Sequence, residues 1–540
     1  MIDPRATDIE KLRQNSEFDV VVVGGGINGI GTFRDLALQG LRVLLVERND
    51  FCSGCSAAPS RMIHGGLRYL ENGEFDLVRE SLFERDALLK NASHMVFPLP
   101  TVLPVTSVFS GLLNTAMNFF GLPGRPSPRG IVPIMFGLSL YDFLTRKRRL
   151  LPKHKVFNRE QAFSFWPEFA PDLRFAAVYH DAWISHPERL GIELILDGEA
   201  NTDRAIALNY AEIAPSAEGF TVTDRETDAR INVSTRVIVN ATGAWVDETA
   251  ESLGRTPSEQ LVSGTKGSHL ILDNPGLLKA LRDHMVYFEN TDGRVCIVFP
   301  YLGKVLAGAT DIRVKQAARV RCEDDERDYI LGSLRLIFPR ITLSTNDIVY
   351  SYSGIRPLPT ADVDFTGRIS REHFTRKLDG AVPQFCMIGG KWTTFRAFAD
   401  QTTDMVLAEL GVKRSMSTRD LAIGGGNGFE HEVKDRFAEL YGTRAVQFRT
   451  DLTPIAESDL TVGEVRSMIT LEKARTVADV LQRRQPLAIT GQLTTSIIEG
   501  TARVMADILG WDSARIHTEV DNFVSELVRY HGVNSERLKE

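Results

Sequence analysis

The order of apolar and polar positions predicts a strand, a turn, a helix and a second strand near the start of the chain. Residues 19–23 are an aspartate and four valines, a β-branched run typical of a buried parallel strand. Residues 30–39 have a helical pattern, and Gly40 stands where a C-terminal cap is expected. Residues 42–47 form a second apolar run that ends in Glu47. Together, residues 18–47 predict a β-α-β unit.

The turn of this unit, residues 24–29, reads Gly-Gly-Gly-Ile-Asn-Gly. Glycines let the backbone turn tightly and approach a pyrophosphate, and the helix N-terminus offers free N–H groups to that anion. Glu47, about 20 residues on, is placed to accept hydrogen bonds from ribose hydroxyls. These features predict a dinucleotide site, although the turn alone does not distinguish FAD from NAD.

Helical and strand patterns alternate farther along the chain. Residues 188–201 predict a helix, whereas residues 204–213, 220–224 and 229–240 predict strands. Strands of a second sheet are expected over residues 268–272, 295–300 and 304–307. After about residue 410 the sequence is charged and helix-favouring. Helical periodicity covers residues 461–484 and 495–509, and the glycine run 424–428 is interpreted as a linker.

Composition narrows the class of protein. A chain of 540 residues implies two or three domains, and 43% hydrophobic with 25% charged residues is typical of a soluble globular protein. The net charge of −7 argues against nucleic-acid binding. Cys52 and Cys55 form the only C-x-x-C pair, so a zinc site is not predicted, and the few cysteines favour a reducing, cytoplasmic compartment. His180, Asp181 and His186 have no recognised metal spacing, and no metal is assigned.

Two segments bear on location. Residues 1–17 lack the apolar core of a signal peptide and are expected to be a flexible lead-in or a short surface helix. Residues 95–124 are uncharged, but their prolines exclude a spanning helix. Within them residues 105–122 are mildly amphipathic, and a basic cluster follows at Arg146, Lys147, Arg148, Arg149, Lys153 and Lys155. This arrangement suits either docking on an anionic membrane face or a helix that covers the core.

Several motifs carry a family resemblance. They are His64-Gly65-Gly66-Leu67-Arg68-Tyr69-Leu70, Asn240-Ala241-Thr242-Gly243-Ala244-Trp245, Lys266-Gly267-Ser268-His269, Ser353-Gly354-Ile355-Arg356-Pro357-Leu358 and Gly389-Gly390-Lys391. In these motifs and their order, most of residues 18–399 resembles the FAD-dependent glycerol-3-phosphate dehydrogenases. The resemblance implies an α/β and α+β fold: an FAD-binding Rossmann-like domain interleaved with a mostly antiparallel substrate-binding sheet domain over residues 18–410, and a helical C-terminal domain over residues 411–540. The substrate part is expected mainly at residues 95–180 and 262–350.

The same resemblance implies oxidation of sn-glycerol 3-phosphate to dihydroxyacetone phosphate, with hydride transfer to FAD and electrons passed to a membrane quinone. It places the protein on the inner face of the cytoplasmic membrane, with a homodimer as an option. Alternatives are another polyol phosphate such as erythritol phosphate, an oxygen-using or amine-oxidising relative, and a non-enzymatic protein that keeps a nucleotide for stability. Substitutions relative to the family pattern keep the substrate open: Phe33, Ala57, Pro59, Arg61, Ala309 and Phe395.

The expected site residues follow from the motifs and from the chemistry. Arginine and lysine match phosphate oxygens, and an imidazole suits proton transfer. Arg356, Lys391 and His269 are therefore expected to be catalytic, with His64 as a competing base, and Arg68 and Tyr69 join Arg356 and Lys391 around the substrate. The expected cofactor residues are Gly24, Gly26, Ile27, Asn28, Gly29, Glu47, Arg48, Ser56, Ser60, Arg61, Met62, Gly65, Gly66, Ala211, Thr242, Gly243, Gly390, Lys391 and Thr393.

Overall fold

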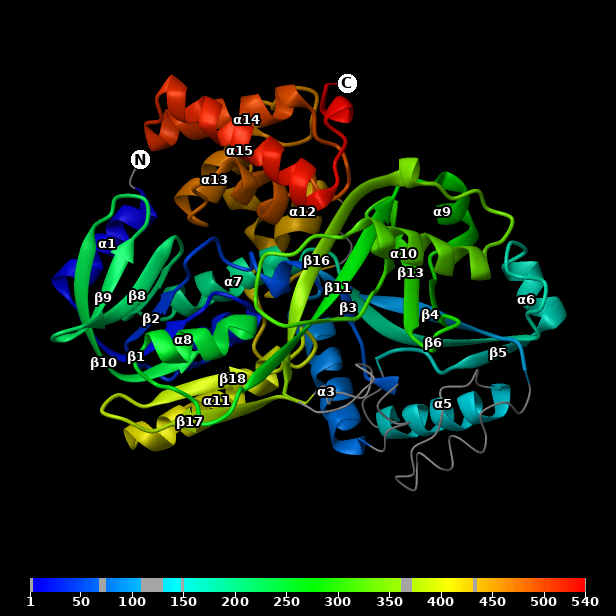
Figure 1. Ribbon diagram of the computed structural model, residues 1–540, viewed down its shortest axis with the longest axis horizontal. Coiled ribbons are helices and arrows are strands. Elements are labelled where there is room, and N and C mark those ends of the chain that lie inside the picture. Colours follow the sequence, from blue (N-terminus) through cyan, green and yellow to red (C-terminus); the bar gives the residue numbers. More distant parts are fainter. Residues whose placement is uncertain are drawn as a thin grey trace.

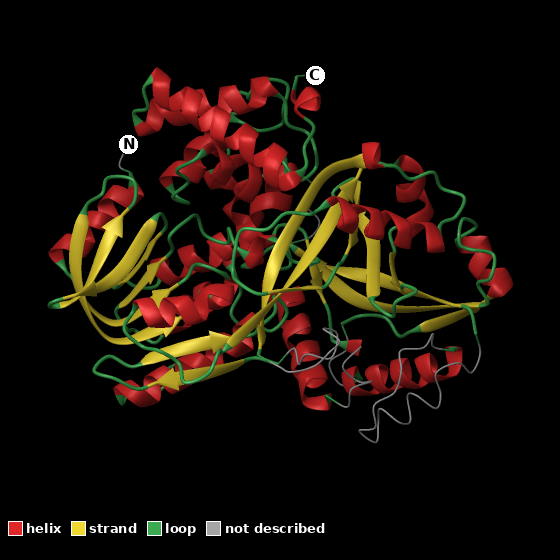
Figure 2. Ribbon diagram, in the orientation of Figure 1, coloured by secondary structure: helices red, strands yellow, loops and turns green. Residues whose placement is uncertain are grey.

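Two β-sheets and a group of C-terminal helices make up the protein (Figure 1). The computed structural model describes residues 3–67, 74–107, 130–146, 150–360, 372–430 and 435–539. In Figure 2 the two sheets lie at opposite ends of the long axis, and the C-terminal helices pack across one side of both. Among the described residues, no helix is both long and apolar enough to cross a membrane.

The first sheet has the strand order β17-β18-β10-β1-β2-β7. Its neighbours from β18 to β7 are parallel, as the buried apolar runs predicted, whereas β17 is antiparallel to β18. The antiparallel strands β8 and β9 extend the sheet beside the first half of β10. The bounds are β1 Glu17–Val23, β2 Val43–Val46, β7 Ala205–Leu208, β8 Ala211–Ser216, β9 Gly219–Asp224, β10 Arg230–Asn240, β17 Phe374–Leu378 and β18 Gln384–Ile388.

Helices cover both faces of this sheet. On one face α2 (Ile27–Leu38) packs between α7 (Pro187–Ala200) and α11 (Phe395–Leu410). Alternate valines of β1 face them, with Val20 and Val22 in the same core as Ile30 and Phe33. The other valines face a second core that includes α1 (Pro4–Gln14), and α8 (Val246–Ser252) packs beside β18. Burial on both faces explains why β1 has no polar alternation after Asp19.

The second sheet has the order β15-β11-β14-β13-β12-β4-β6-β3, with β16 beside β11 and β5 beside β6. All its pairs are antiparallel except β4 with β12. The strands are β3 Met62–Ile63, β4 Val96–Val105, β5 Lys155–Asn158, β6 Phe175–Ile184, β11 Val262–Leu272, β12 Met285–Glu289, β13 Val295–Tyr301, β14 Lys304–Gly308, β15 Ile312–Val314 and β16 Ile348–Pro359. Around it lie α3 Phe75–Asn91, α5 Ile131–Thr145, α6 Arg159–Phe165, α9 Pro275–Leu281 and α10 Asp324–Ile337. The two sheets are thus interleaved along the chain, and the predicted fold class is confirmed.

The C-terminal helices pack on the second sheet. They comprise α12 Arg436–Tyr441, α13 Val462–Thr470, a π-helix Asp479–Arg484, α14 Thr495–Leu509 and α15 Ser513–His531. Their apolar side chains share one core with Met62, Ile271 and Tyr350 of the sheet.

The structure corrects four expectations about elements. The N-terminal segment is not a flexible lead-in: it forms α1, the helical alternative. Residues 204–213 are two strands, since Asn209 and Tyr210 turn the chain and the buried Asn209 amide bonds Asp50 and Lys473. Residues 461–484 are two helical pieces separated near Lys473, whose φ is 57°. The glycine run 424–426 is a packed 3-10 turn rather than a loose linker, because its N–H groups donate to Asp197 and Glu193.

Candidate active site

A large cavity lies at the carboxyl ends of the parallel strands, where open α/β sheets bind ligands. Its volume is ≈ 1040 Å³, at the upper end of the range for ligand pockets. The walls come from the first sheet, from β11 and β16 of the second sheet and from the C-terminal helices. The cavity therefore lies where all three parts of the protein meet.

The glycine turn forms one end of the cavity. A Cβ on Gly24 would lie 2.7 Å from the carbonyl oxygen of Ala241, and one on Gly25 would lie 2.8 Å from Cβ of Glu47. The N-cap of α2, Gly26, has no side chain to cap the helix, and although Ser56 Oγ accepts the N–H of Ile27, the helix N-terminus still favours an anion. Glycine is needed at positions 24 and 25 because the turn lies very close to the ends of β10 and β2.

Glu47 lies in the same wall, at the end of β2. Its two carboxylate oxygens accept hydrogen bonds from the N–H groups of Gly25 at 2.7 Å and Asn49 at 2.8 Å. Burial raises the pKa of Glu47, and those two hydrogen bonds oppose the rise. The side chain is therefore held in one orientation facing the cavity.

The loop after β2 is tied to the glycine turn and to the segment that carries Lys391. Ser56 Oγ accepts the N–H of Ile27 at 2.9 Å, and its carbonyl accepts the indole N–H of Trp392 at 3.1 Å. The amide of Asn28 donates to the carbonyl of Gly389. A Cβ on Gly390 would lie 2.5 Å from that amide, so only glycine allows this approach. Segments far apart in sequence thus converge on one site.

Arg61 is predicted to bind the cofactor, but its guanidinium group has other partners. It donates to both carboxylate oxygens of Glu188, at 2.8 and 3.1 Å. It also lies 5.1 Å from the ring centre of Tyr301 and 5.7 Å from that of Tyr352. The guanidinium group is buried at the cavity wall. Its positive charge is neutralised by Glu188 and is therefore not available to a cofactor phosphate.

His269 and Arg356 face the cavity from neighbouring strands. In the register of β11 with β16, His269 lies opposite Tyr352, and the two rings stack at 5.0 Å. Burial, together with the charges of Arg356 and Arg61, lowers the pKa of His269 to about 3. Neither ring nitrogen of this buried histidine has a hydrogen-bond partner among the described residues. The imidazole is therefore neutral at pH 7, and both nitrogens are available to a ligand.

The Arg356 side chain crosses the face of β11. Its Nη1 donates to Asp311 at 3.1 Å and to the carbonyl of Thr310 at 3.3 Å. A Cβ on Gly267 would lie 2.0 Å from Nη2 of Arg356, so the glycine in the Lys-Gly-Ser-His motif makes room for the guanidinium. The side chain is 25% exposed and lines the cavity. A partly exposed fork in this position can turn toward an anion.

Lys391 lines the cavity where the chain leaves β18. Positive φ angles at Gly389 (80°) and Gly390 (101°) produce the turn that presents it. Burial and the charge of Lys391 lower the pKa of His373 to about 4. Burial and the nearby Glu84 raise the pKa of Glu80 to about 7, against the charges of Lys391 and Arg396. The positive charge of Lys391 therefore acts on Glu80 and His373, two side chains that do not line the cavity.

Most predicted site residues meet at the cavity. Those on its wall are Gly24, Gly26, Ile27, Asn28, Glu47, Arg48, Ser56, Ser60, Arg61, Met62, Ala211, Thr242, Gly243, His269, Arg356, Gly390, Lys391 and Thr393, with the competitor His64. Gly29, Gly65 and Gly66 are off the wall. Arg68 and Tyr69 lie outside the described residues.

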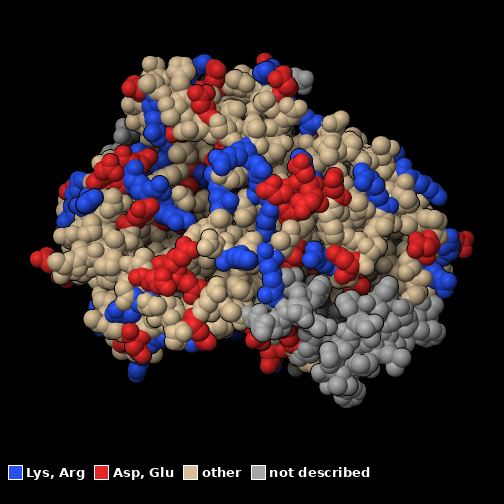
Figure 3. Space-filling view, in the orientation of Figure 1, with Lys and Arg blue, Asp and Glu red and all other residues tan. Residues whose placement is uncertain are grey.

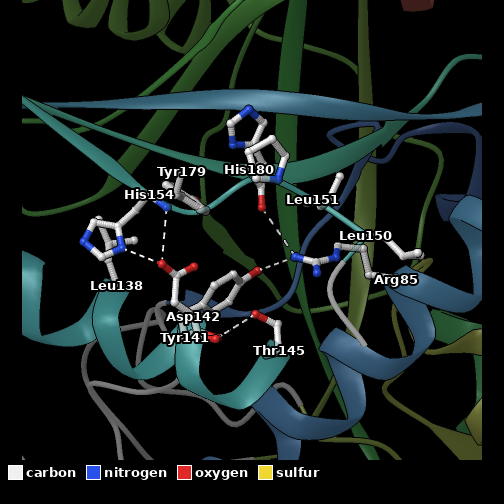
Figure 4. Close-up of a pocket in the computed structure, with 11 residues that line it drawn as sticks. Arg85, Leu138, Tyr141, Asp142, Thr145, Leu150, Leu151, His154, Tyr179 and His180 are labelled. Atoms are coloured by element: carbon white, nitrogen blue, oxygen red, sulfur yellow. Dashed lines mark hydrogen bonds and ion pairs between the residues drawn. The ribbon is translucent and has the colours of Figure 1, made fainter. Parts of the chain in front are cut away.

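Gly65 has a packing role instead. Its N–H donates to Asp181 at 2.8 Å, and a Cβ there would lie 2.1 Å from the Tyr141 hydroxyl. Tyr141 also donates to Asp181 and accepts from Arg85. Figure 4 shows this side of the network, where Arg85, Tyr141 and the His154–Asp142 pair surround a pocket of only ≈ 10 Å³. At most one water fits, so the network supports the glycine loop rather than binding a ligand.

The sequence did not identify the cavity residues from the C-terminal part. Gln482, Arg483, Phe523, Glu526 and Tyr530 belong to this wall. They come from helical segments without glycine turns or motifs, so no local signal marks them. Within the described parts of the chain, no group of three His, Cys, Asp or Glu side chains is arranged to hold a metal ion.

The residues present fit FAD. The cavity is large enough for a dinucleotide, Gly24 and Gly25 leave no room for a Cβ, and the α2 N-terminus and Glu47 stand where pyrophosphate and ribose bind in such sites. The Gly389–Gly390 turn lies against Asn28. Lys391, which follows this turn, lines the same cavity.

Comparison with known proteins agrees with this geometry. Residues 19–405 match the family described as FAD dependent oxidoreductase, and residues 377–516 match the C-terminal domain of alpha-glycerophosphate oxidase. A glycerol-3-phosphate dehydrogenase of Synechocystis is 32% identical, over 94% of this chain and 96% of the relative. A D-erythritol 1-phosphate dehydrogenase of Brucella abortus is 30% identical, over 86% and 93%.

Among solved structures, the FAD complex of a glycerol-3-phosphate dehydrogenase from Bacillus halodurans has the same fold. It superposes with a TM-score of 0.75 at 24% identity and covers 97% of both chains. The resemblance inferred from the motifs is therefore confirmed. The chain is an FAD-dependent enzyme and belongs to the family of FAD-dependent glycerol-3-phosphate dehydrogenases.

Proposed function

We propose that the protein oxidises sn-glycerol 3-phosphate to dihydroxyacetone phosphate and passes the electrons to a membrane quinone. The convergence of Arg356, Lys391 and His269 on one cavity with the dinucleotide cradle carries this proposal. Bound FAD would take the hydride from the secondary alcohol and later release the electrons. The substrate must therefore present its hydroxyl group to the flavin and its phosphate group to Arg356 and Lys391.

Arg356 and Lys391 hold the substrate in this scheme. Guanidinium and ammonium groups bind phosphate oxygens through charge-assisted hydrogen bonds, and Arg356 is already oriented by Asp311. Arg68 and Tyr69, which belong to the family motif, complete the substrate pocket in the proposal. Fixing the phosphate sets the reacting carbon against the cofactor and restricts its motion.

His269 is the proposed proton acceptor, with His64 as the competitor on the same wall. The pKa of about 3 keeps the His269 imidazole neutral, so a lone pair is available for the hydroxyl proton. The same low pKa makes it a weak base, and the proton would have to leave it quickly.

Contact with the membrane is proposed through α5. Its apolar side chains Val132, Met135, Phe136, Phe143 and Leu144 are between 39% and 69% exposed. Arg146 follows directly and lies over the ring of Phe143. Exposed apolar side chains beside a basic group suit the inner face of a cytoplasmic membrane. Most of the predicted amphipathic segment 105–122, and Lys147, Arg148 and Arg149, lie outside the described residues.

A tetritol phosphate is the second candidate substrate. It is favoured by the similar identity of the Brucella relative named as a D-erythritol 1-phosphate dehydrogenase. The altered residues Ala57, Pro59 and Arg61 all line the cavity, so the pocket can differ from the family's most frequent form.

Anaerobic reduction of the purified flavoprotein tests the proposal. The visible flavin band should bleach with glycerol 3-phosphate, or with erythritol phosphate if that is the substrate. Reoxidation by a quinone analogue, compared with air, distinguishes a dehydrogenase from an oxidase. Bleaching by an amino acid and by no polyol phosphate would overturn the proposed chemistry.

Replacing Arg356 by alanine should lower turnover by at least about 100-fold, because a substrate-holding charge is lost. FAD content should be unchanged, since Arg356 lies outside the glycine cradle. Arg376→Ala on β17, where the side chain is half exposed, serves as the matched control. Turnover in Arg356→Ala equal to that of the control would remove Arg356 from the site.

A further inference from the structure

A second pocket adjoins the flavin cavity. Its volume is ≈ 330 Å³, and it lies between the segment that follows β15 and the end of α15. The lining residues are Lys266, Arg319, Val320, Arg321, Glu323, Arg529 and Tyr530. Three of them, Arg319, Val320 and Tyr530, also line the flavin cavity. The two spaces therefore share a wall, and we call the smaller one the outer pocket.

Arg319 joins the two sides of the outer pocket. Its guanidinium pairs with Glu526 of α15 at 2.5 Å and lies 3.9 Å from the ring centre of Tyr530. These contacts attach the segment around Arg319 to α15. Arg319 is thus a fixed part of the wall rather than a free side chain.

The lining holds four cations and one carboxylate, that of Glu323, but Arg319 and Lys266 are paired with the carboxylates of Glu526 and Glu326 behind the lining. Figure 3 shows Lys and Arg side chains gathered where the end of α15 meets the second sheet, beside an acidic cluster over the start of α10. Lys266 is 8% exposed and pairs with Glu326. The charge of Lys266 is therefore partly compensated. The positive charge available to a ligand comes from Arg321 and Arg529, which we call the rim arginines.

Two rim arginines can turn toward a ligand. Arg529 has no ion-pair partner among the described residues, and its guanidinium lies 5.3 Å from the ring centre of Tyr530. Arg321 pairs with Glu323, but both side chains are about half exposed, so this ion pair contributes little free energy. Reorienting either guanidinium costs correspondingly little.

The chemistry of this lining selects a small phosphate dianion. Planar guanidinium forks match phosphate oxygens in pairs, and Tyr530 adds a hydroxyl. A nucleotide would need a ring surface to stack on, and the Tyr530 ring is covered by Arg319. A volume of ≈ 330 Å³ suits a phosphate monoester of a few carbons or orthophosphate.

We propose that the outer pocket binds the phosphate group of the substrate before it enters the flavin cavity. This inference rests on the proposed function, because it takes a phosphate monoester as the substrate. The rim arginines raise the local concentration of the dianion beside the flavin cavity and accelerate its capture. Such electrostatic capture raises association rates by about 10-fold or more at low salt and is lost when charges are screened.

The first test compares Arg321→Gln/Arg529→Gln with Arg13→Gln/Arg503→Gln. Both doubles remove two exposed arginines, but Arg13 and Arg503 lie on α1 and α14, away from both pockets. The second-order rate constant for anaerobic flavin bleaching by glycerol 3-phosphate is measured from about 0.01 M to about 1 M salt. At low salt it should fall about 10-fold in the rim double only. The two doubles should converge at high salt, and saturating substrate should restore the rate.

A second arm needs no turnover. Inorganic phosphate is titrated into the oxidised holoenzyme at low salt by calorimetry, and the rim double should bind it about 10-fold more weakly than the control double. Equal phosphate affinity and equal rate constants in the two doubles would overturn the outer pocket while leaving the proposed function intact. Weaker phosphate binding without any change in rate would overturn the capture of substrate and identify a site for free phosphate. If no phosphate ester bleaches the wild type, the proposed function fails, and capture of substrate fails with it; the titration then decides whether the pocket binds phosphate.

Discussion

Gly29 shows how a residue can belong to a cofactor motif without facing the cofactor. It lies in the first turn of α2, off the cavity wall, and a Cβ there would lie 2.0 Å from the carbonyl oxygen of Gly24. Because it has no side chain, the start of α2 can lie directly against the glycine turn. Gly29 is therefore needed for the close packing of α2 against the end of β1.

Gly29→Ala should consequently weaken FAD retention, because the helix must move away from Gly24 or the turn must shift. The measurement is flavin absorbance per chain after gel filtration, and we expect a large loss. Gly332→Ala in α10 is the control, since a Cβ there meets nothing within 4 Å. That variant should keep its flavin and unfold at the same or a slightly higher temperature. Full flavin content in Gly29→Ala would contradict the packing argument.

At the scale of elements, α1 is anchored by buried ion pairs, among them that of Arg5 with Asp224. Arg5 is 2% exposed; it pairs with Asp224 at 2.5 Å and donates to the carbonyl of Asn209 at 2.9 Å. Leu12 is fully buried in the core below β1. The polar composition of residues 1–17 concealed this anchoring, because a buried arginine and an exposed one look the same in a sequence.

Arg5→Ala should lower the free energy of unfolding by about 3 kcal/mol, since it leaves the Asp224 carboxylate buried and unpaired. Chemical denaturation followed by fluorescence measures the change. Arg13→Ala on the same helix removes an exposed ion pair with Glu10 and should change it by no more than about 0.5 kcal/mol. Equal effects of the two substitutions would show that α1 is not anchored through Arg5.

At the scale of the whole molecule, four buried histidines link stability to pH. Burial lowers the pKa of His186 and His269 to about 3 and that of His373 and His531 to about 4. In the unfolded chain the histidine pKa is about 6.5. Between these values the unfolded state binds more protons, so stability is fully present above about pH 6.5 and is lost as pH falls toward 4 and 3.

We therefore expect the melting temperature to fall steadily from pH 7 to pH 4.5. Each such histidine contributes up to about 1.4 kcal/mol per pH unit to the slope. His186 is the N-cap of α7, a position where asparagine is favourable. The substitution His186→Asn should therefore reduce the slope of the unfolding free energy against pH by the contribution of one proton. A pH dependence identical to that of the wild type would mean that the pKa of His186 is the same in the folded and unfolded states.

Much of the first sheet and of the cofactor site was predictable, because β1 and β2 carry uninterrupted apolar runs and the turn between them carries glycines at fixed spacing. Arg356, Lys391 and His269 were predicted as a group from the family resemblance, and all three line the same cavity. The Glu188 partner of Arg61 lies 127 residues away, and no local pattern encodes such a pairing. The C-terminal wall and the turn at Asn209 escaped prediction for the same reason: they depend on contacts between distant segments.

Asp50 connects the loop after β2 to the C-terminal helical segment that contains Arg483 and Arg484. It lies just beyond Glu47, is 1% exposed, and accepts hydrogen bonds from Arg483 at 2.7 Å and Arg484 at 3.0 Å. A ligand that orders this loop must also stabilise the helices that hold it, by thermodynamic linkage. Protease sensitivity of α14 and α15 should therefore report flavin occupancy: the apoprotein should be cut there several-fold faster, and added FAD should restore resistance. Unchanged cleavage would show that the two ends of the chain unfold independently.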